Sequence, residues 1–315
     1  MADISTFVTE IKSSVLISAT SPQRLAHLRL LAIVINKWLP PSPSPDLATN
    51  SLISSLTQPT SFSPDDEATR IMISFWVTKS LSMKSNRLSE PLVLQLVNNL
   101  SSPTHGALSA RGFTVLLGED ELLNKTNYAV QRLLSKQKVF SLCIPILVER
   151  FKQADKPTKP NFLIALSNIL RHIPSKIFLT SLPLLVPLLL QSLDLPTSTL
   201  EEEDVTLATL STLSITILEQ ADVLQEHVSS LITRLVKAAT YSGTPGQGPP
   251  PKVRRAALRC LGIFPRALRG EVILPFKRLV VRGLSEALDD PKRWVRKEAV
   301  DCRMRWGEVD EPAEE

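Results

Sequence analysis

The chain has 315 residues, of which 43% are hydrophobic, 21% charged and 5% aromatic, and its formal net charge is +5. This apolar content excludes an intrinsically disordered chain, and the length strains a single compact core, because such cores tend to split beyond roughly 250 to 300 residues. Only 10 glycines, 4 histidines and 3 cysteines are present, which argues against turn-rich sheet proteins and against glycine-lined cofactor sites. A stack of repeats, which can grow with chain length, is the expected alternative.

Apolar residues recur at spacings of three and four almost throughout, so we predict an all-α chain. In the first half, helices are expected at about residues 3–19, 22–39, 47–57, 88–100, 104–117, 128–136 and 138–154, and a further helix start is expected at residues 63–67. In the second half, they are expected at about residues 159–173, 176–193, 201–220, 223–241, 252–264, 271–288 and 291–306. The proline-rich run at 40–45 and the Gly/Pro-rich stretch at 242–251 are predicted to interrupt this pattern.

An internal period is the strongest signal in the second half of the chain. Phe162, Val205 and Val253 each stand three residues before an alanine at the start of an amphipathic helix, and Val295 shares a Val-Arg pair with Val253. These four anchor residues are separated by 43, 48 and 42 residues. A two-helix unit of ~40 to 47 residues is the period of HEAT and armadillo repeats. We therefore predict a HEAT/armadillo-type α-solenoid of stacked antiparallel helix pairs.

Charged residues in the last two repeats fit the pattern of stacked aspartate and arginine side chains between HEAT repeats. Asp289 and Asp290 precede the last predicted helix, and Arg254 and Arg296 each follow an anchor valine. The interpretation is that these arginines hold neighbouring repeats together.

The positive charge is concentrated near the C-terminus. Residues 252–305 contain 15 Lys/Arg and 6 Asp/Glu, a net charge of +9, whereas residues 1–251 carry +1 and residues 306–315 carry −5. Three interpretations are open: a docking surface for an acidic protein, a solvated face partly neutralised by the tail, and a nucleic-acid surface that lacks interleaved aromatic residues. The residues predicted to dock a protein are Lys292, Arg293, Trp294 and Lys297, and then Arg255 and Arg259.

No catalytic, metal or cofactor site is predicted. Cys260 and Cys302 each lie seven residues after an anchor valine, but no CxxC or clustered Cys/His set accompanies them, so buried structural thiols are expected. An odd number of scattered cysteines favours a reducing compartment. The most apolar stretch, residues 179–193, is shorter than the ~20 residues of a membrane span, and the N-terminus lacks a signal-peptide pattern.

Several stretches are similar to one known family. They are residues 75–81 (FWVTKSL), 159–163 (KPNFL), 166–170 (LSNIL), 274–277 (LPFK) and 288–300 (LDDPKRWVRKEAV). Together they resemble the C-terminal HEAT-repeat domain of the methyl-methanesulfonate-sensitivity nineteen family, over about residues 60 to 306. We therefore expect N-terminal helical repeats at residues 1–58, the C-terminal HEAT-repeat domain at 59–306 and a disordered acidic tail at 307–315.

The resemblance implies a non-catalytic adaptor of the cytosolic iron-sulfur cluster assembly targeting complex, located in the cytoplasm and nucleus. The implied partners are a WD-repeat propeller, a small acidic-cysteine subunit and apo iron-sulfur proteins such as DNA helicases, primase and polymerases. Under this hypothesis we expect neither a membrane partner nor direct binding of nucleic acid. The alternative is a nucleic-acid or transcription/repair-complex binding module that uses the same basic repeats.

Overall fold

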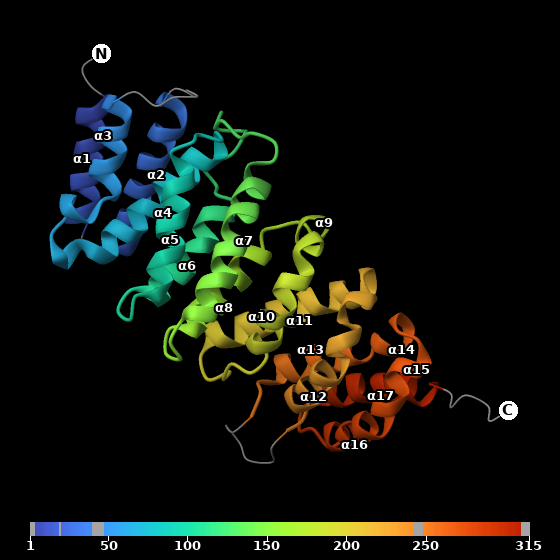
Figure 1. Cartoon of the computed structure of the whole chain (residues 1–315). Helices are drawn as coiled ribbons and strands as arrows, with labels where there is room; N and C mark the ends of the chain where they lie inside the picture. Colours follow the sequence, from blue (N-terminus) through green and yellow to red (C-terminus); the bar gives the residue numbers. More distant parts are fainter. Residues whose placement is uncertain (1–3, 19, 40–46, 242–247, 310–315) are drawn as a thin grey trace. The chain divides into compact units, whose positions relative to one another are not determined.

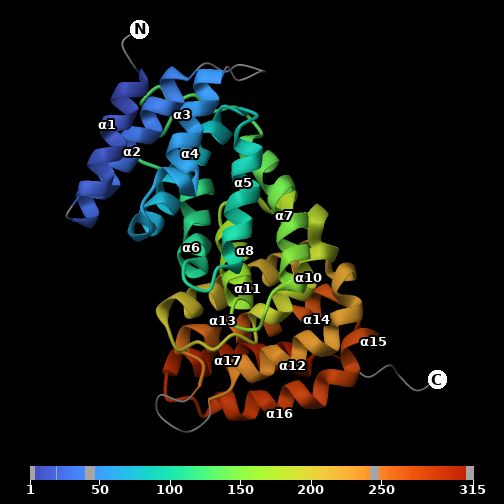
Figure 2. The ribbon, with the colours of Figure 1, turned by 60° about the vertical axis from the view of Figure 1, so that its left-hand side comes forward.

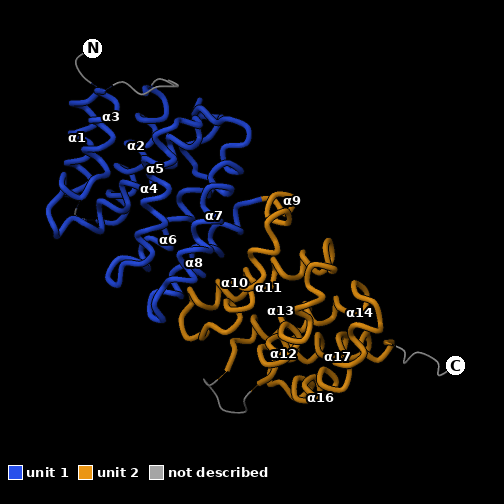
Figure 3. Tube along the Cα trace, in the orientation of Figure 1, with its two compact units in different colours: residues 1–173 blue, residues 174–315 orange. Residues whose placement is uncertain are grey.

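The computed structural model describes residues 4–18, 20–39, 47–241 and 248–309. Over these residues the regular elements are α-helices and short 3-10 helices, with no strand, which confirms the predicted all-α class. The chain divides into two compact units, residues 1–173 and 174–315 (Figure 3).

Unit 1 is a two-layer stack of helices. Its helices are α1 (Ile4–Ile17), α2 (Ser21–Trp38), α3 (Leu47–Thr57), α4 (Glu67–Met83), α5 (Ser89–Asn98), α6 (Gly106–Leu117), α7 (Ser135–Gln153) and α8 (Lys159–Leu170), with 3-10 turns η1 (Pro59–Ser61), η2 (Pro64–Asp66) and η3 (Asn99–Ser101). Helices α2, α4, α6 and α8 pack against one another in that order, and α1, α3, α5 and α7 lie beside them (Figures 1 and 2).

Unit 2 repeats the same arrangement. It contains α9 (Ser175–Phe178), α10 (Leu182–Ser192), α11 (Leu200–Glu219), α12 (Val228–Ala239), α13 (Pro251–Leu261), α14 (Phe264–Ala267), α15 (Gly270–Ile273), α16 (Lys277–Leu288) and α17 (Arg293–Gly307), with 3-10 turns η4 (Leu179–Ser181), η5 (Ala221–His227) and η6 (Leu274–Phe276). Helices α11, α13 and α17 stack as one layer, and α10, α12 and α16 form the other (Figure 1). Each unit thus has the stacked helix pairs of the predicted α-solenoid.

The repeat anchors occupy corresponding places in these stacks. Phe162 is buried near the start of α8, and Val205, Val253 and Val295 are buried near the starts of α11, α13 and α17. The predicted spacing to an alanine needs a correction, because Ala256, three residues after Val253, is only half-buried, whereas Ala257 has no exposed surface. Residues four apart share a helix face, so in α13 the buried alanine lies one position later than expected, whereas in α8 Ala165, three residues after Phe162, is fully buried.

Three predicted helices begin one or two turns later than expected. Residues 179–181, 221–227 and 274–276 form 3-10 turns that lead into α10, α12 and α16. Pro183 stands in the first turn of α10, and Pro275 in the 3-10 turn before α16. Since proline has no N–H to donate, it fits a first turn, where the N–H groups have no intrahelical partner.

The helix predicted at residues 128–136 is wrong, because the chain is a loop from Gly118 to Leu134. The N–H of Val130 donates to Asn36 Oδ1 at 2.7 Å, and Asn36 Nδ2 donates to the Val130 carbonyl at 3.1 Å. Leu133 is 85% exposed, so its periodic spacing does not mark a buried face. A buried asparagine on α2 holds the segment extended instead.

The predicted domain limits stay predictions. The limit at 58/59 falls inside unit 1, between α3 and η1, and one apolar cluster contains residues from both sides of it, such as Leu56 and Trp76. Of the expected acidic tail, Gly307 ends α17 and Val309 is buried, while residues 310–315 lie outside the described residues. Residues 40–46 and 242–247, which include most of the two predicted interruptions, also lie outside them.

One apolar segment is long enough to be compared with a membrane span. Ser175–Ser192 has 18 residues with a mean hydropathy of 1.4, which meets the requirement by length and composition alone. Half of it is buried within the protein, and a buried core helix gives the same pattern.

Candidate docking surface

A buried ion pair joins the last two helix pairs of unit 2. Asp290, in the turn between α16 and α17, is 1% exposed, and Arg254 of α13 is 3% exposed. Arg254 donates from Nε to Asp290 Oδ2 at 2.6 Å and from Nη2 to Oδ1 at 3.1 Å, and Oδ1 also accepts the N–H of Lys292 at 2.8 Å. Both carboxylate oxygens are therefore hydrogen-bonded, as a buried charge requires.

The other two residues predicted at this seam lie differently. Arg296 donates from Nη1 to the backbone carbonyls of Asp290 at 2.7 Å and Pro291 at 3.2 Å, so it holds the turn that precedes its own helix. Asp289 is exposed at the end of α16, and its carboxylate makes no hydrogen bond to the two arginines in the described part of the chain. Three of the four predicted residues thus form one cluster, which Asp289 does not join.

A second cluster lies at the exposed side of α13 and α17. Trp294, in the first turn of α17, is 37% exposed, and the Arg255 guanidinium lies 5.6 Å from its ring centroid. Arg255 Nε and Arg259 Nε approach the same carboxylate oxygen, Glu298 Oε2, at 3.2 and 2.8 Å. Residues 255 and 259 on α13 and residues 294 and 298 on α17 are each four apart, so each pair shares a helix face. The stacking of α13 on α17 brings the two faces together.

We call this surface the α13–α17 face. It is a shallow concave patch lined by Leu207, Lys252, Arg255, Ala256, Arg259 and Trp294. Lys297 lies next to Trp294 around α17, and Lys292 and Arg293 stand at the N-terminal end of that helix, all three exposed. The structure therefore places all six residues predicted to dock a partner on or beside this face.

The charges of the face are only partly balanced. Glu298 serves both Arg255 and Arg259, and it is itself largely buried, whereas the two arginine side chains are 41% and 56% exposed. Over the described residues, no acidic side chain lies within ion-pair distance of Lys252, Arg293 or Lys297. The face thus presents a positive potential around a half-exposed tryptophan and a small apolar floor, which suits an acidic protein segment with an apolar anchor.

Two members of the face were missed by the sequence analysis. Glu298 lies four residues after Trp294, and this spacing could have shown that the acid shares the tryptophan's side of α17. Leu207 comes from α11, and nothing in its local sequence indicates that it borders the basic residues. The basic residues of α16 form a separate exposed set, which includes Arg278 and Arg282.

The cysteines offer no reactive thiolate. Cys260 and Cys302 are buried, as predicted, and so is Cys143, and burial raises the pKa of each thiol to about 12. The thiols are therefore protonated at neutral pH, whereas metal binding and nucleophilic attack need the thiolate. Among the described residues, no three His, Cys, Asp or Glu side chains are grouped in a way that could hold a metal ion.

Comparison with known proteins places the chain in a family. The family described as "RNAPII transcription regulator C-terminal", or MMS19_C, matches residues 1–265. The chain belongs to the MMS19 C-terminal family. The mouse MMS19 nucleotide excision repair protein homolog is 36% identical over 243 residues, which are 76% of this chain and 22% of the mouse protein. The human homolog is 37% identical over 232 residues, and the fission yeast DNA repair/transcription protein mms19 is 29% identical over 284 residues, or 90% of this chain and 27% of that protein.

The matches also show how much of each relative the chain covers and where the family match begins. The chain spans about a fifth to a quarter of the length of the curated relatives it matches. The MMS19_C match also begins at residue 1, before the expected domain start at residue 59.

Solved structures support the fold alone. An engineered protein aligns over 98% of both chains with a TM-score of 0.50 and 15% identity, and a second one aligns over 97% of this chain with a TM-score of 0.50 and 14% identity.

Proposed function

We propose that this MMS19_C chain is a non-catalytic adaptor in cytosolic iron-sulfur protein assembly, in the cytoplasm and nucleus, that contributes to DNA repair and transcription. The observation that carries the proposal is the α13–α17 face, where exposed cations surround Trp294 and Glu298 balances only part of their charge. A stacked-helix scaffold with such a face acts by holding partners together, and tethering raises their effective concentration to about millimolar without chemistry from the scaffold. The printed names of the family and its relatives, which refer to excision repair and transcription, support the repair and transcription part of this proposal.

The proposed partners are those implied by the family resemblance. The WD-repeat propeller and the small acidic-cysteine subunit dock on the α13–α17 face, and apo iron-sulfur proteins such as DNA helicases, primase and polymerases are held within reach of the cluster donor. Protonated, buried thiols support a scaffold that does not carry the cluster itself.

Charge reversal tests the docking role. The variant Lys292→Glu, Arg293→Glu, Lys297→Glu changes three exposed cations that have no described acidic partner, and acids at a helix N-terminus are compatible with α17. We expect co-precipitation of the propeller subunit to fall by about tenfold or more, because several rim charges change sign together. Circular dichroism establishes that the helices are retained.

The matched control is Arg266→Glu, Arg278→Glu, Arg282→Glu. It changes the net charge equally, on exposed residues outside the α13–α17 face. Full recovery of the propeller subunit by the docking variant, with its fold intact, would remove the assignment. Equal losses in both variants would show that net charge, and not this face, controls binding.

The unbalanced cations also favour a second candidate, a nucleic-acid or transcription/repair-complex binding module. Counterion release then makes the logarithm of affinity fall linearly with the logarithm of salt concentration. Fluorescence anisotropy with labelled duplex and single-stranded DNA measures this slope. No binding at low salt excludes direct nucleic-acid contact and leaves the adaptor proposal standing.

A further inference from the structure

A cavity of about 390 Å³ opens in unit 1 and shares no residue with the α13–α17 face. Its walls are the C-terminal half of α4, the end of α6, the loop from Gly118 to Leu134 and the first turn of α7. The wall residues combine an apolar floor, with Met83, Leu117 and Val139, and a rim of charged and amide side chains. Such a mixture is typical of a site for a small organic ligand with a polar group.

Three lysines line this cavity. Lys79 is buried in α4, and its Nζ donates to the carbonyls of Val115 at 2.8 Å and Gly118 at 2.6 Å. An ammonium group has three N–H donors, so one remains available. Lys125 is exposed and Lys136 is half-buried, and within the described residues neither lies in ion-pair contact with an acid.

The start of α7 adds a second source of positive potential. This helix has 19 residues, and its first two, Ser135 and Lys136, both line the cavity. The N-cap residue Leu134 has a left-handed φ of 67° and provides no side-chain hydrogen bond to the first turn. The Ser135 N–H already donates to the Arg132 carbonyl at 3.3 Å, but no N-cap side chain neutralises the positive end of the helix at the amides that follow.

An independent observation comes from Ser82 on α4. Ser82 is one of the residues that line the cavity and is 7% exposed, and its Oγ, itself buried, has no hydrogen-bond partner among the described residues. Buried hydroxyl groups are nearly always hydrogen-bonded, because leaving one unpaired costs about 1–3 kcal/mol. An acceptor bound in the cavity satisfies this requirement.

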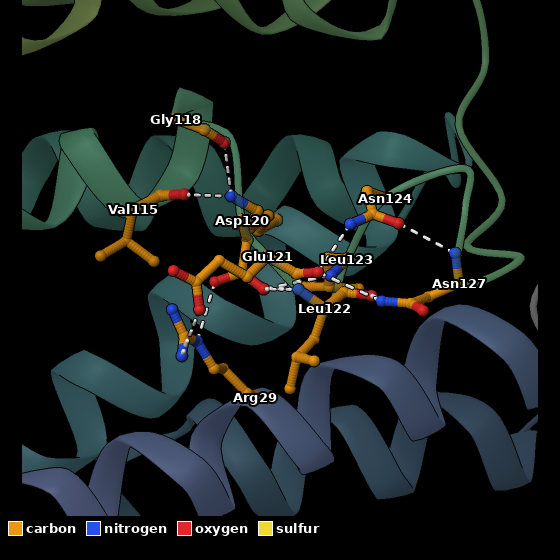
Figure 4. A network of polar contacts seen from close by, with 10 residues as sticks. Arg29, Val115, Gly118, Asp120, Glu121, Leu122, Leu123, Asn124 and Asn127 are labelled. Carbon is orange, nitrogen blue, oxygen red and sulfur yellow. Dashed lines mark hydrogen bonds and ion pairs between the residues drawn. The ribbon is translucent and has the colours of Figure 1, made fainter.

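The acidic residues of the wall do not cancel the lysines. Asp120 is already paired: Arg29 Nε donates to its Oδ2 at 2.9 Å, and the N–H groups of Leu122 and Leu123 donate to its Oδ1 at 2.9 and 3.1 Å (Figure 4). Burial alone raises the pKa of Asp120, but these donors outweigh it and the pKa is lowered, so the carboxylate stays ionised within its own network. Asp120 also favours the charged form of Lys79, but Arg29 balances its charge, so the exposed Glu119 is the one wall acid without an ion-pair partner among the described residues.

A neighbouring histidine responds to the same potential. The His172 ring lies against Gly118, and its buried Nε2 has no hydrogen-bond partner in the part of the chain that the structure describes. Burial lowers the pKa of His172, and Lys136, Arg171 and Lys79 lower it further, whereas Glu119 opposes the change. The neighbouring cations thus add to the effect of burial in disfavouring the charged form of His172.

We propose that this cavity binds a phosphoryl group attached to an organic moiety, with the group held by Lys136, Lys79, the Ser82 hydroxyl and the first amides of α7. Helix N-termini with lysines and a hydroxyl form a common type of phosphate site, because the three phosphoryl oxygens accept several donors at once. The apolar floor receives the organic part. A small phosphate ester and a phosphoserine side chain share this chemistry.

Isothermal titration of the full chain tests the proposal with three probes: inorganic phosphate, glycerol 3-phosphate, and a phosphoserine peptide compared with its unphosphorylated form. We expect saturable binding of at least one phosphorylated probe. Lys136→Gln and Ser82→Ala should each weaken it by about fivefold or more, as the loss of a charge-assisted hydrogen bond predicts, and circular dichroism checks that each variant keeps its helices.

Lys138→Gln is the matched control. Lys138 lies in the same first turn of α7 but pairs with Glu90 at 2.8 Å and does not line the cavity. Tighter binding of glycerol 3-phosphate identifies a small molecule as the ligand source, and tighter binding of the phosphopeptide identifies a protein. No saturable binding of any probe overturns the proposal, and so does an equal loss in Lys138→Gln and Lys136→Gln. Since these residues lie outside the α13–α17 face, the outcome is independent of the docking test.

Discussion

Removing the carboxylate of Asp290 tests the account of the seam in unit 2. The variant Asp290→Ala deletes both hydrogen bonds to Arg254 and the one from the Lys292 N–H. It leaves the Arg254 guanidinium buried, with the Pro249 carbonyl at 2.6 Å and the Tyr241 ring at 5.1 Å as remaining contacts. Breaking a buried ion pair costs about 3–5 kcal/mol, and the two retained contacts place the expected loss near 3 kcal/mol.

Urea unfolding followed by circular dichroism and fluorescence measures this loss. The fluorescence signal of unit 2 includes that of Trp306, which is fully buried and donates to the Leu261 carbonyl at 2.9 Å, whereas Trp38 and Trp76 report unit 1. Arg254→Met should cost a similar amount, since it leaves Asp290 unpaired. The double variant should lower the free energy of unfolding by clearly less than the sum of the two single losses, because no uncompensated charge remains in it. A loss below about 1 kcal/mol for Asp290→Ala, or strict additivity in the double variant, would refute the reasoning.

Two further predictions concern unit 1. Gly112→Ala in α6 ordinarily stabilises a helix by up to about 1 kcal/mol, but the new Cβ collides with the Phe75 ring of α4, so we expect a loss of about 1–3 kcal/mol in urea unfolding. The same substitution at Gly270, which has open space around it, is the control, and a gain at Gly112 would contradict the packing argument. Burial lowers the pKa of Lys79 from 10.5 to about 8, so between these pH values the unfolded chain binds a proton that the folded chain does not. The free energy of unfolding of the wild type, relative to that of Lys79→Met, should therefore rise by up to about 3 kcal/mol as pH rises through this window. Thermal unfolding of both proteins across that range measures the difference, and a constant difference would show that Lys79 titrates normally.

The sequence predicted those features that depend on neighbours along the chain. Helix positions follow from the local period, and the Arg254–Asp290 contact follows from its place in a repeat, because each repeat stacks on the next in a fixed register. The loop before α7 could not be predicted, since its bonds to Asn36 come from a residue 94 positions away.

The candidate sites likewise combine features that the local sequence predicts with features that depend on distant residues. The total of basic residues near the C-terminus located the α13–α17 face, but a charge total does not show that Glu298 takes up two of the arginines. The cavity in unit 1 left no local signal, because Lys79 and Ser82 stand in α4, where 13 of 17 residues are buried, and a helix buried on every side has no polar stripe to mark them.

The Arg254–Asp290 pair also affects how the chain assembles. Repeats of one solenoid offer similar apolar faces, so α17 could slide along α13 by one turn, about 5.4 Å, and still bury apolar side chains. Such a slip separates the guanidinium from its carboxylate and leaves each buried without a counter-charge, which disfavours the shifted arrangement by several kcal/mol. The pair therefore discriminates between correct and displaced stacking, and we expect seam variants to misassemble or exchange helix pairs between molecules during refolding more often than the wild type.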